Sequence, residues 1–169
     1  MADFKNIHVK ISQLKKYVQH SVPVIIGTEA VNHFKDSFQN EGFTDENLVK
    51  WEDVKRRDAS SSWYGFNYIG EKQKKGERKA NKSSAAQTRK ILSGNTQELG
   101  SAIDWEQSGN VIRILAKTKY SQIHNEGGDV SVFGKHKATM PKRQFMGASA
   151  VLKRKIETMI TNDINKILK

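Results

Sequence analysis

Apolar side chains recur at helical spacing near both ends of the chain. Near the N-terminus the steps alternate between three and four residues, which places one apolar face on a helix, made of Phe4, Ile7, Ile11, Leu14 and Val18. A second stripe follows at Ile26, Ala30, Phe34 and Phe38, and it stops near Gly42. We expect two helices with a break near Pro23, because proline is tolerated in a first helical turn but not inside a helix.

The second half of the chain predicts a hairpin and a terminal helix. Apolar and polar residues alternate at Ile103 and Trp105, residues 107–110 favour a turn, and residues 111–116 alternate again, which is typical of a β-hairpin. The final stripe, with Ser149 placed to cap its start, is Leu152, Ile156, Met159, Ile160, Ile164, Ile167 and Leu168. The pattern predicts an α+β fold in which two N-terminal helices and a long C-terminal helix pack on a small, mainly antiparallel β-sheet.

Length and composition favour one domain over residues 1–169, because two domains would each be small for 169 residues. Residues 69–90 are rich in Lys, Ser, Gly, Gln and Asn and carry almost no large apolar side chain, which predicts a flexible basic loop. No apolar run approaches the length of a membrane span, and residues 1–10 lack a leader pattern. We therefore expect a soluble protein with no membrane partner, and the absence of cysteine fits a reducing cytoplasm.

The formal charge of +11 is concentrated in two segments. Residues 50–90 and residues 135–155 each carry a net charge of +7, so the rest of the chain is mildly acidic. Such a distribution favours attraction to a polyanion or to an acidic protein surface. The alternative for the first segment is a lysine-rich loop that only solvates the protein. The residues predicted to contact DNA or an acidic partner are Lys72, Lys74, Lys75, Arg78, Lys79 and Lys82.

Four aromatic residues within positions 63–68 precede the basic loop, so a basic nucleic-acid-binding module is the alternative function. Aromatic side chains beside cations stack on the bases of single-stranded nucleic acid. The cluster lacks the regular strand spacing of an RNA-binding sheet, however, and aromatic residues that flank a loop more often anchor it.

His124, followed by Glu126 and Asp129, suggests a metal or acid–base site. The other histidines show no ligand spacing with it, and no paired carboxylates accompany it, so a structural histidine that hydrogen-bonds nearby backbone is the favoured interpretation. The sequence also contains neither a nucleophile–base pair nor a phosphate-binding glycine loop. We therefore predict no cofactor, no metal, no catalytic residue and no enzymatic activity.

Short motifs occur over nearly the whole chain in the order typical of a known family. Their positions are, in chain order, Phe38, Trp51, Ile91-Leu92-Ser93-Gly94, Leu99, Ser101-Ala102-Ile103, Tyr120-Ser121-Gln122-Ile123-His124-Asn125-Glu126-Gly127-Gly128 and Pro141-Lys142-Arg143-Gln144-Phe145-Met146-Gly147. In these motifs the chain resembles the phage virion-morphogenesis or tail-completion family, typified by the Mu-like G protein and including proteins of the tail protein S type. Two departures from the family pattern are Gln144, which stands where proline is usual, and residues 63–88, which match poorly.

This resemblance implies a structural subunit that completes the tail or the head–tail neck of a tailed phage or prophage. Such a protein is expected to form a ring of identical copies, to contact other tail, neck or head proteins, and to reside in the virion after assembly in the host cytoplasm. The family-motif residues expected to be structural are Trp51, Gly94, Leu99, Tyr120, Ile123, His124, Gly127 and Gly128.

A ring requires one surface patch to meet a different patch on the next subunit. We expect the segment from Pro141 to Gly147 to supply one patch, because arginine and aromatic residues most often carry interface energy. In this hypothesis Phe145 is an apolar anchor and the neighbouring cations are charged partners. The predicted interface residues are Pro141, Lys142, Arg143, Phe145 and Met146.

Overall fold

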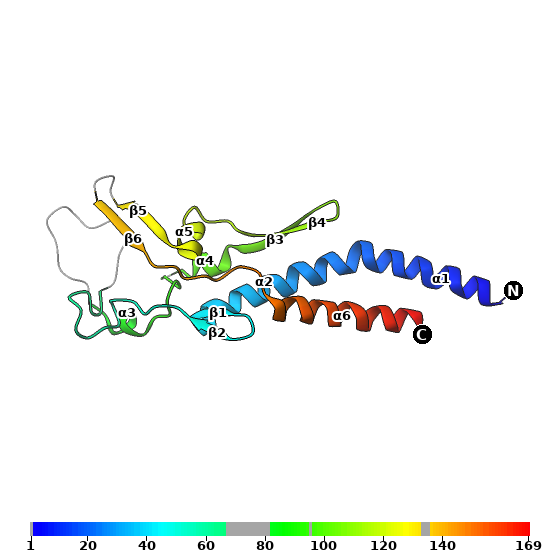
Figure 1. Ribbon diagram of the computed structural model, residues 1–169, viewed down its shortest axis with the longest axis horizontal. Coiled ribbons are helices and arrows are strands. Elements are labelled where there is room, and N and C mark those ends of the chain that lie inside the picture. Colours follow the sequence, from blue (N-terminus) through cyan, green and yellow to red (C-terminus); the bar gives the residue numbers. More distant parts are fainter. Residues whose placement is uncertain (1, 67–81, 95, 133–135) are drawn as a thin grey trace.

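The computed structural model describes residues 2–66, 82–94, 96–132 and 136–169 (Figure 1). Its helices are α1 (Ala2–Lys16), the π-helical turn η1 (Tyr17–Ser21), α2 (Val22–Asn40), α3 (Ser84–Thr88), α4 (Glu98–Ser101), α5 (Ser121–Glu126) and α6 (Ala150–Leu168). Its strands are β1 (Gly42–Thr44), β2 (Leu48–Lys50), β3 (Ile103–Ser108), β4 (Val111–Ala116), β5 (Gly128–Val132) and β6 (His136–Met140). The predicted α+β class is confirmed. Among the described residues the strands form three separate antiparallel ribbons, β1–β2, β3–β4 and β5–β6, rather than one sheet.

The two predicted N-terminal helices are one continuous rod, so the predicted break near Pro23 is wrong. In η1 the backbone N–H of Val22 donates to the carbonyl of Tyr17, five residues back, which is the wider π-helical hydrogen bond. Proline lacks an N–H and its ring crowds the carbonyl four residues earlier. Because the wide turn lies next to Pro23, the chain accommodates the proline and continues as α2 (Figure 1).

The start of α6 is fixed by side-chain caps, as predicted for Ser149. The hydroxyl of Ser149 accepts a hydrogen bond from the Leu152 N–H at 3.2 Å. Asp45, which follows β1, accepts from the Ser149 hydroxyl at 3.0 Å and from the Val151 N–H at 3.1 Å. These bonds tie the first turn of α6 to the end of β1.

From this start α6 runs back along the N-terminal rod, so that both chain ends lie at the same end of the molecule (Figure 1). Three polar contacts follow this antiparallel course: Lys155 with Glu29 at 2.7 Å, the Tyr17 hydroxyl with Asp163 at 3.2 Å, and the Lys10 ammonium with the Leu168 carbonyl at 2.7 Å. None of the helices in the described ranges has the length and apolar character needed to cross a lipid bilayer.

The predicted hairpin is confirmed as β3–β4. Its strands pair in register from Ile103 with Ala116 to Ser108 with Val111, and a two-residue turn joins them. The ribbon packs on α2 through Trp105, whose indole lies so close to Gly27 that any side chain at position 27 would collide with it. Gly27 therefore sets the close approach of helix and ribbon.

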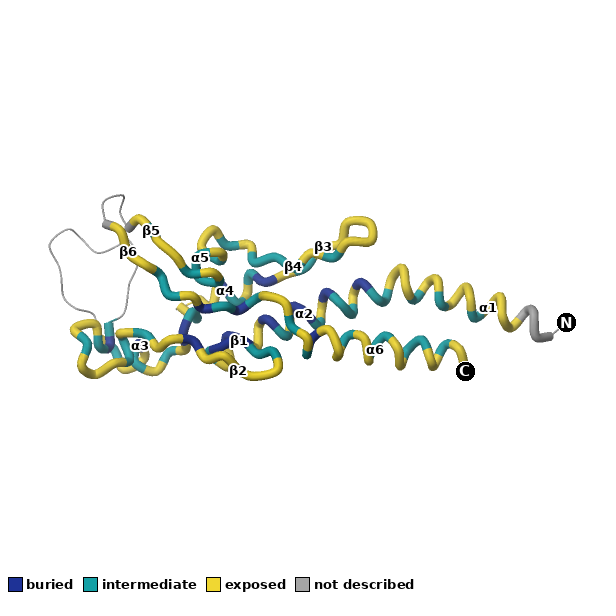
Figure 2. Tube along the Cα trace, viewed as in Figure 1, coloured by how far each residue is buried: buried dark blue, intermediate teal, exposed yellow. Residues whose placement is uncertain are grey.

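The buried core lies where α2, β1, α4 and the segment before α6 meet, in the middle of the molecule (Figure 2). Its members are Ala30, Val31, Phe34, Phe38, Phe43, Trp51, Ile91, Leu99, Ile103, Phe145 and Leu152. The part of α1 whose side chains are described, residues 6–16, contributes no buried residue. The stability of the rod therefore depends on α2, while α1 extends beyond the core.

The end of the predicted flexible loop at residues 69–90 is ordered differently from expectation. Residues 84–88 form α3, whose start is capped by the Ser83 hydroxyl, and Ala86 is fully buried. The guanidinium of Arg56 donates to the carbonyls of Ala86, at 2.9 Å, and of Arg89, at 2.8 Å. A small buried residue and hydrogen bonds from the distant Arg56 side chain thus hold a segment that lacks large apolar side chains. Residues 67–81 lie outside the described residues.

Candidate docking face and basic clefts

The segment predicted to be an exposed docking element, residues 141–147, has Arg143 and Phe145 buried inside the subunit; we refer to it as the buried arm. The Phe145 side chain is 1% exposed, and its ring centroid lies 5.2 Å from that of Phe38. Arg143 is 7% exposed, and its guanidinium donates twice to the Glu52 carbonyl at 3.2 Å. The prediction that Phe145 and Arg143 dock on a neighbouring subunit is therefore wrong, because their own subunit already surrounds them.

Side chains distant in sequence satisfy the backbone of the buried arm. The indole N–H of Trp51 donates to the Gln144 carbonyl at 2.7 Å. The side-chain oxygen of Asn125 accepts from the N–H groups of Phe145 and Met146, both at 2.9 Å. A buried extended segment without a strand partner needs such substitutes, since unpaired backbone groups are costly to bury. Sequence reasoning missed Asn125, although it lies within a motif that was singled out.

The remaining predicted interface residues are only partly exposed to a neighbouring subunit. Lys142 is exposed, whereas Pro141 and Met146 are half-buried, and Met146 packs against the core. Gly127 has a φ of 73°, and a side chain there would lie 2.8 Å from the Lys142 backbone nitrogen. The glycine after α5 thus permits the chain to pass beside the arm.

The other family-motif residues surround the arm or the clefts described below. Trp51 and Leu99 belong to the core, Ile123 is half-buried, Tyr120 is 37% exposed, and Gly94 and Gly128 have φ angles of 55° and 123°. The His124 carbonyl accepts from the Arg143 N–H at 2.9 Å. Burial lowers the pKa of His124, and the Arg143 charge adds to that shift.

His124 differs from its prediction in one respect. Its Nδ1 atom is buried and makes no hydrogen bond, so the predicted bond to nearby backbone is not formed at this atom. Within the described ranges, no group of three His, Cys, Asp or Glu residues could hold a metal ion.

An ion-pair network at the end of α2 was not predicted. Glu41 has a left-handed φ of 51°, and its carboxylate accepts from the Arg57 guanidinium, at 2.9 Å for one pair, and from the Ile91 N–H at 2.7 Å. Arg57 also donates to the Arg89 carbonyl at 2.7 Å. The hydrogen bond from Arg57 holds the pKa of Glu41 below its ordinary value despite partial burial. The network fixes residues 89–91 against the end of α2.

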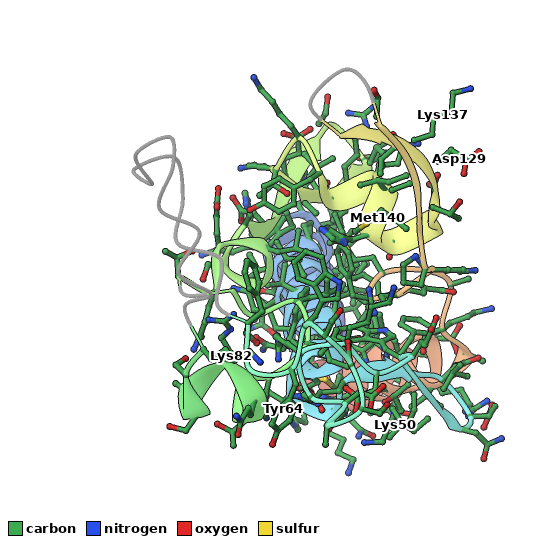
Figure 3. All side chains as sticks on the ribbon, turned by 90° about the vertical axis from the view of Figure 1, so that its left-hand side faces the viewer. Lys50, Tyr64, Lys82, Asp129, Lys137 and Met140 are labelled. Carbon is green, nitrogen blue, oxygen red and sulfur yellow. The ribbon has the colours of Figure 1, made fainter. Side chains whose placement is uncertain are left out.

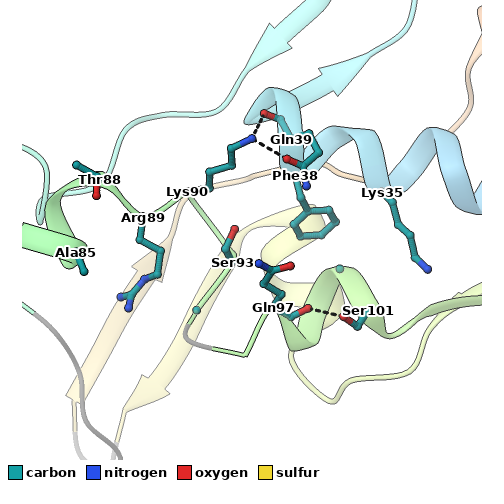
Figure 4. Close-up of a pocket in the computed structure, with 12 residues that line it drawn as sticks. Lys35, Phe38, Gln39, Ala85, Thr88, Arg89, Lys90, Ser93, Gln97 and Ser101 are labelled. Atoms are coloured by element: carbon teal, nitrogen blue, oxygen red, sulfur yellow. Dashed lines mark hydrogen bonds between the residues drawn. The ribbon is translucent and has the colours of Figure 1, made fainter.

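Beside this network lies a cleft of about 680 Å³ between α2, α3 and residues 93–101 (Figure 4). Its charged lining residues are all cations, namely Lys35, Arg89 and Lys90. The Lys90 ammonium donates to the Gln39 carbonyl at 2.9 Å and to its side-chain oxygen at 2.7 Å. The other lining residues are Phe38, Gln39, Ala85, Thr88, Ser93, Gly94, Gln97, Gly100 and Ser101.

A second cleft, of about 490 Å³, shares Arg89 with the first. Its remaining lining residues are Lys55, Arg56, Trp63 and Phe66. Trp63 is 51% exposed, and its ring stands edge-on to that of Phe66 at a centroid distance of 5.0 Å. The two clefts together place cations beside an exposed indole.

Of the six residues predicted to contact DNA or an acidic partner, the structure describes Lys82. It is exposed and its backbone forms an isolated antiparallel bridge with Phe66. Figure 3 shows Lys82 beside α3, whereas Lys137 lies on the β5–β6 ribbon at the opposite side of the view. The two basic segments of the sequence therefore do not merge into one patch at these positions. Lys72, Lys74, Lys75, Arg78 and Lys79 lie outside the described residues.

Comparison of the chain with protein-family models, with curated proteins and with solved structures found no match. The candidate surfaces must therefore be judged by their own geometry.

An exposed apolar row runs along the N-terminal end of the rod; we call it the α1 stripe and define it as Ile7, Ile11 and Leu14 of α1 together with Val18 of η1. Ile7, Ile11 and Val18 are 51%, 45% and 50% exposed, and Leu14 is half-buried. The polar contacts of α6 with α1 and η1 come from Lys10 and Tyr17, which lie seven residues apart on a neighbouring face. Three of its four side chains are therefore open to solvent.

Proposed function

We propose that this protein is a structural assembly subunit that binds copies of itself through the α1 stripe. In the role implied by its motifs, it completes the tail or head–tail neck of a tailed phage or prophage as an oligomeric ring within the virion. The observation that carries the proposal is the half-exposed row of Ile7, Ile11 and Val18 on a helix that extends beyond the core.

The spacing of the α1 stripe favours a helix as its partner. Ile7, Ile11, Leu14 and Val18 follow steps of four, three and four residues, which is the repeat that lets one helix insert side chains between those of another. Helix α6 lies along one edge of α1 and leaves the remainder open. A neighbouring copy supplies helices of the same kind, and in a ring the stripe packs against a different face of that copy's helices.

The energy available from this contact suits subunit association. Fully burying an Ile or Val side chain contributes about 1.5–3 kcal/mol, so covering the exposed half of one contributes about 1 kcal/mol. Three such residues give roughly 3 kcal/mol for each contact, before the apolar surface that the neighbouring face adds and before the cost of association. The stripe therefore supports association and needs further contacts for a stable ring.

The buried arm supports the proposal indirectly. Trp51, Leu99 and Phe145 belong to the motifs in which the chain resembles the tail-completion family, and all three side chains are in the core. The motifs that carry the resemblance thus hold the fold together, which suits a family defined by architecture.

Sedimentation velocity over a range of protein concentrations tests self-association. Wild-type protein is expected to sediment as an oligomer, and Ile11→Asp is expected to raise the dissociation constant at least about tenfold, because it places a charge within an apolar seam. Ser12→Asp is the matched control, since it adds the same charge about 100° further round the helix. Protein that stays monomeric at every concentration, or equal effects of both variants, would refute the proposed interface.

Electron microscopy of the oligomer tests the proposed ring, and particle assembly tests the virion role. A closed ring is expected in the wild-type sample, and Ile11→Asp protein is expected to be missing from purified particles while Ser12→Asp protein is incorporated. An oligomer that never joins tails or necks would contradict the phage role while leaving self-association intact.

A further inference from the structure

We propose that the two basic clefts form one binding track for single-stranded nucleic acid, with phosphate groups against Lys35, Arg89 and Lys90 and a base stacked on Trp63. This activity is separate from self-association, because the track lies at α3 and the end of α2, whereas the α1 stripe lies toward the chain termini (Figure 1).

The charge of the track favours a polyanion. Among the residues that line the two clefts there are five cations and no carboxylate: Lys35, Lys55, Arg56, Arg89 and Lys90. The carboxylates of Glu41 and Asp53 act on Arg56 from outside the lining, and both form ion pairs with Arg57. A concave surface lined by one sign of charge raises the local concentration of the opposite ion.

Polar groups in the first cleft add hydrogen-bonding capacity to this charge. The Ser93 hydroxyl and the Gln97 amide line it and can donate to a phosphate oxygen. The Thr88 and Ser101 hydroxyls, which also line it, donate to the carbonyls of Ser84 and Gln97. Lys90 is held in place by Gln39, so its charge is fixed at the cleft wall (Figure 4). Volumes of about 680 and 490 Å³ are typical of ligand clefts.

Backbone carbonyls hold the Arg56 guanidinium in place, close to the charges of Arg89 and Arg57. Its guanidinium donates to the carbonyls of Ala86, Arg89 and Lys90 at 2.8–3.0 Å. Burial lowers the pKa of Arg56, and the like charges of Arg89 and Arg57 add to that shift. Cations crowded in this way are stabilised by a bound anion.

The exposed indole favours nucleic acid over an acidic peptide. Trp63 shares the second cleft with Lys55, Arg56 and Arg89, and Phe66 supports its edge. A groove of cations with an exposed aromatic ring is the usual arrangement for binding a single strand, because every base has a face that can stack. In a duplex the bases are already stacked, so the indole selects for single strands.

Fluorescence anisotropy with the full chain and a labelled 15-nucleotide oligothymidine tests the track. We expect salt-sensitive binding that Trp63→Ala weakens roughly tenfold or more and that Trp63→Phe largely restores. The double variant Lys35→Gln/Lys55→Gln is expected to reduce the slope of log affinity against log salt by about 0.7 for each lost phosphate contact. The charge-matched control is Arg113→Gln/Lys119→Gln, which alters exposed residues at β4 and after it and should leave the slope unchanged.

Four results would overturn the proposal, provided that circular dichroism shows each variant folded. These are no binding at low salt, an equal loss in the control variant, full affinity in Trp63→Ala, and displacement of the oligonucleotide by polyglutamate at equal charge concentration. The last result would assign the clefts to an acidic protein. Ile11→Asp is expected to retain binding per subunit, which keeps this test independent of self-association.

Discussion

Removing the side-chain oxygen of Asn125 is expected to loosen the buried arm from the core. That oxygen accepts from two consecutive backbone N–H groups, those of Phe145 and Met146, both at 2.9 Å. Among the residues that the structure describes, neither N–H donates to any other acceptor, so both lose their partner in Asn125→Ala. Phe145 is almost fully buried and Met146 is half-buried, so only the second donor can reach water after a small shift.

The expected loss of stability follows from how deeply the N–H groups of Phe145 and Met146 are buried. Leaving a buried donor unpaired costs about 1–3 kcal/mol, and the partly buried donor costs less, so Asn125→Ala should destabilise the protein by about 2–4 kcal/mol. For a chain of this length 1 kcal/mol shifts the melting temperature by about 2–4 °C, so the midpoint should fall by roughly 5–15 °C.

Denaturant unfolding at one fixed protein concentration measures this loss. Trp51 is a suitable fluorescent reporter, because its indole N–H donates to the arm at Gln144. Asn125→Asp preserves an acceptor and is expected to lie within about 1 kcal/mol of wild type near neutral pH. Gln122→Ala, an exposed change one turn earlier on α5, should cost no more than about 0.5 kcal/mol. An Asn125→Ala protein as stable as the Gln122→Ala protein would refute this account of the arm.

Two further predictions concern Glu41 and Gly27. Because Arg57 lowers the folded-state pKa of Glu41, the stabilising contribution of this carboxylate is complete above about 4.5, the ordinary pKa of glutamate, and is lost as pH falls through the lower folded-state pKa. Glu41→Gln should therefore flatten the acid side of a stability–pH curve, and an unchanged curve would contradict this. Gly27→Ala should lower the free energy of unfolding by about 1–3 kcal/mol in thermal unfolding, although alanine favours helices, because the added methyl group meets the Trp105 indole. The double variant Gly27→Ala/Trp105→Leu should recover part of this loss. A Gly27→Ala protein that is more stable than wild type would show that the indole has room for the methyl group.

Local sequence patterns predicted the elements that depend on near neighbours. The hairpin at residues 103–116 follows from alternation and a two-residue turn. The start of α6 follows from Ser149, whose hydroxyl caps the N–H three residues later. Each of these signals is contained within a few consecutive residues.

The placement of the buried arm could not be predicted from consecutive residues. An apolar pair beside Lys142 and Arg143 resembles an exposed docking element when only neighbouring residues are considered. Its burial depends on Trp51 and Asn125, which contact the arm from 93 and 20 or more residues away. The continuity of the rod was missed for a different reason. Proline breaks a helix unless a wider turn precedes it, as the π-helical turn η1 precedes Pro23.

The convergence of distant segments on the buried arm determines when this protein can fold during synthesis. The core aromatic residues Phe38 and Trp51 are made early, but Phe145 completes their packing only after more than ninety further residues have been added. At a translation rate of about 5–20 residues per second, the first third of the chain spends several seconds without its final partner. Contacts of such long sequence separation slow folding, so the nascent chain exposes aromatic surface that a chaperone can bind before the arm arrives.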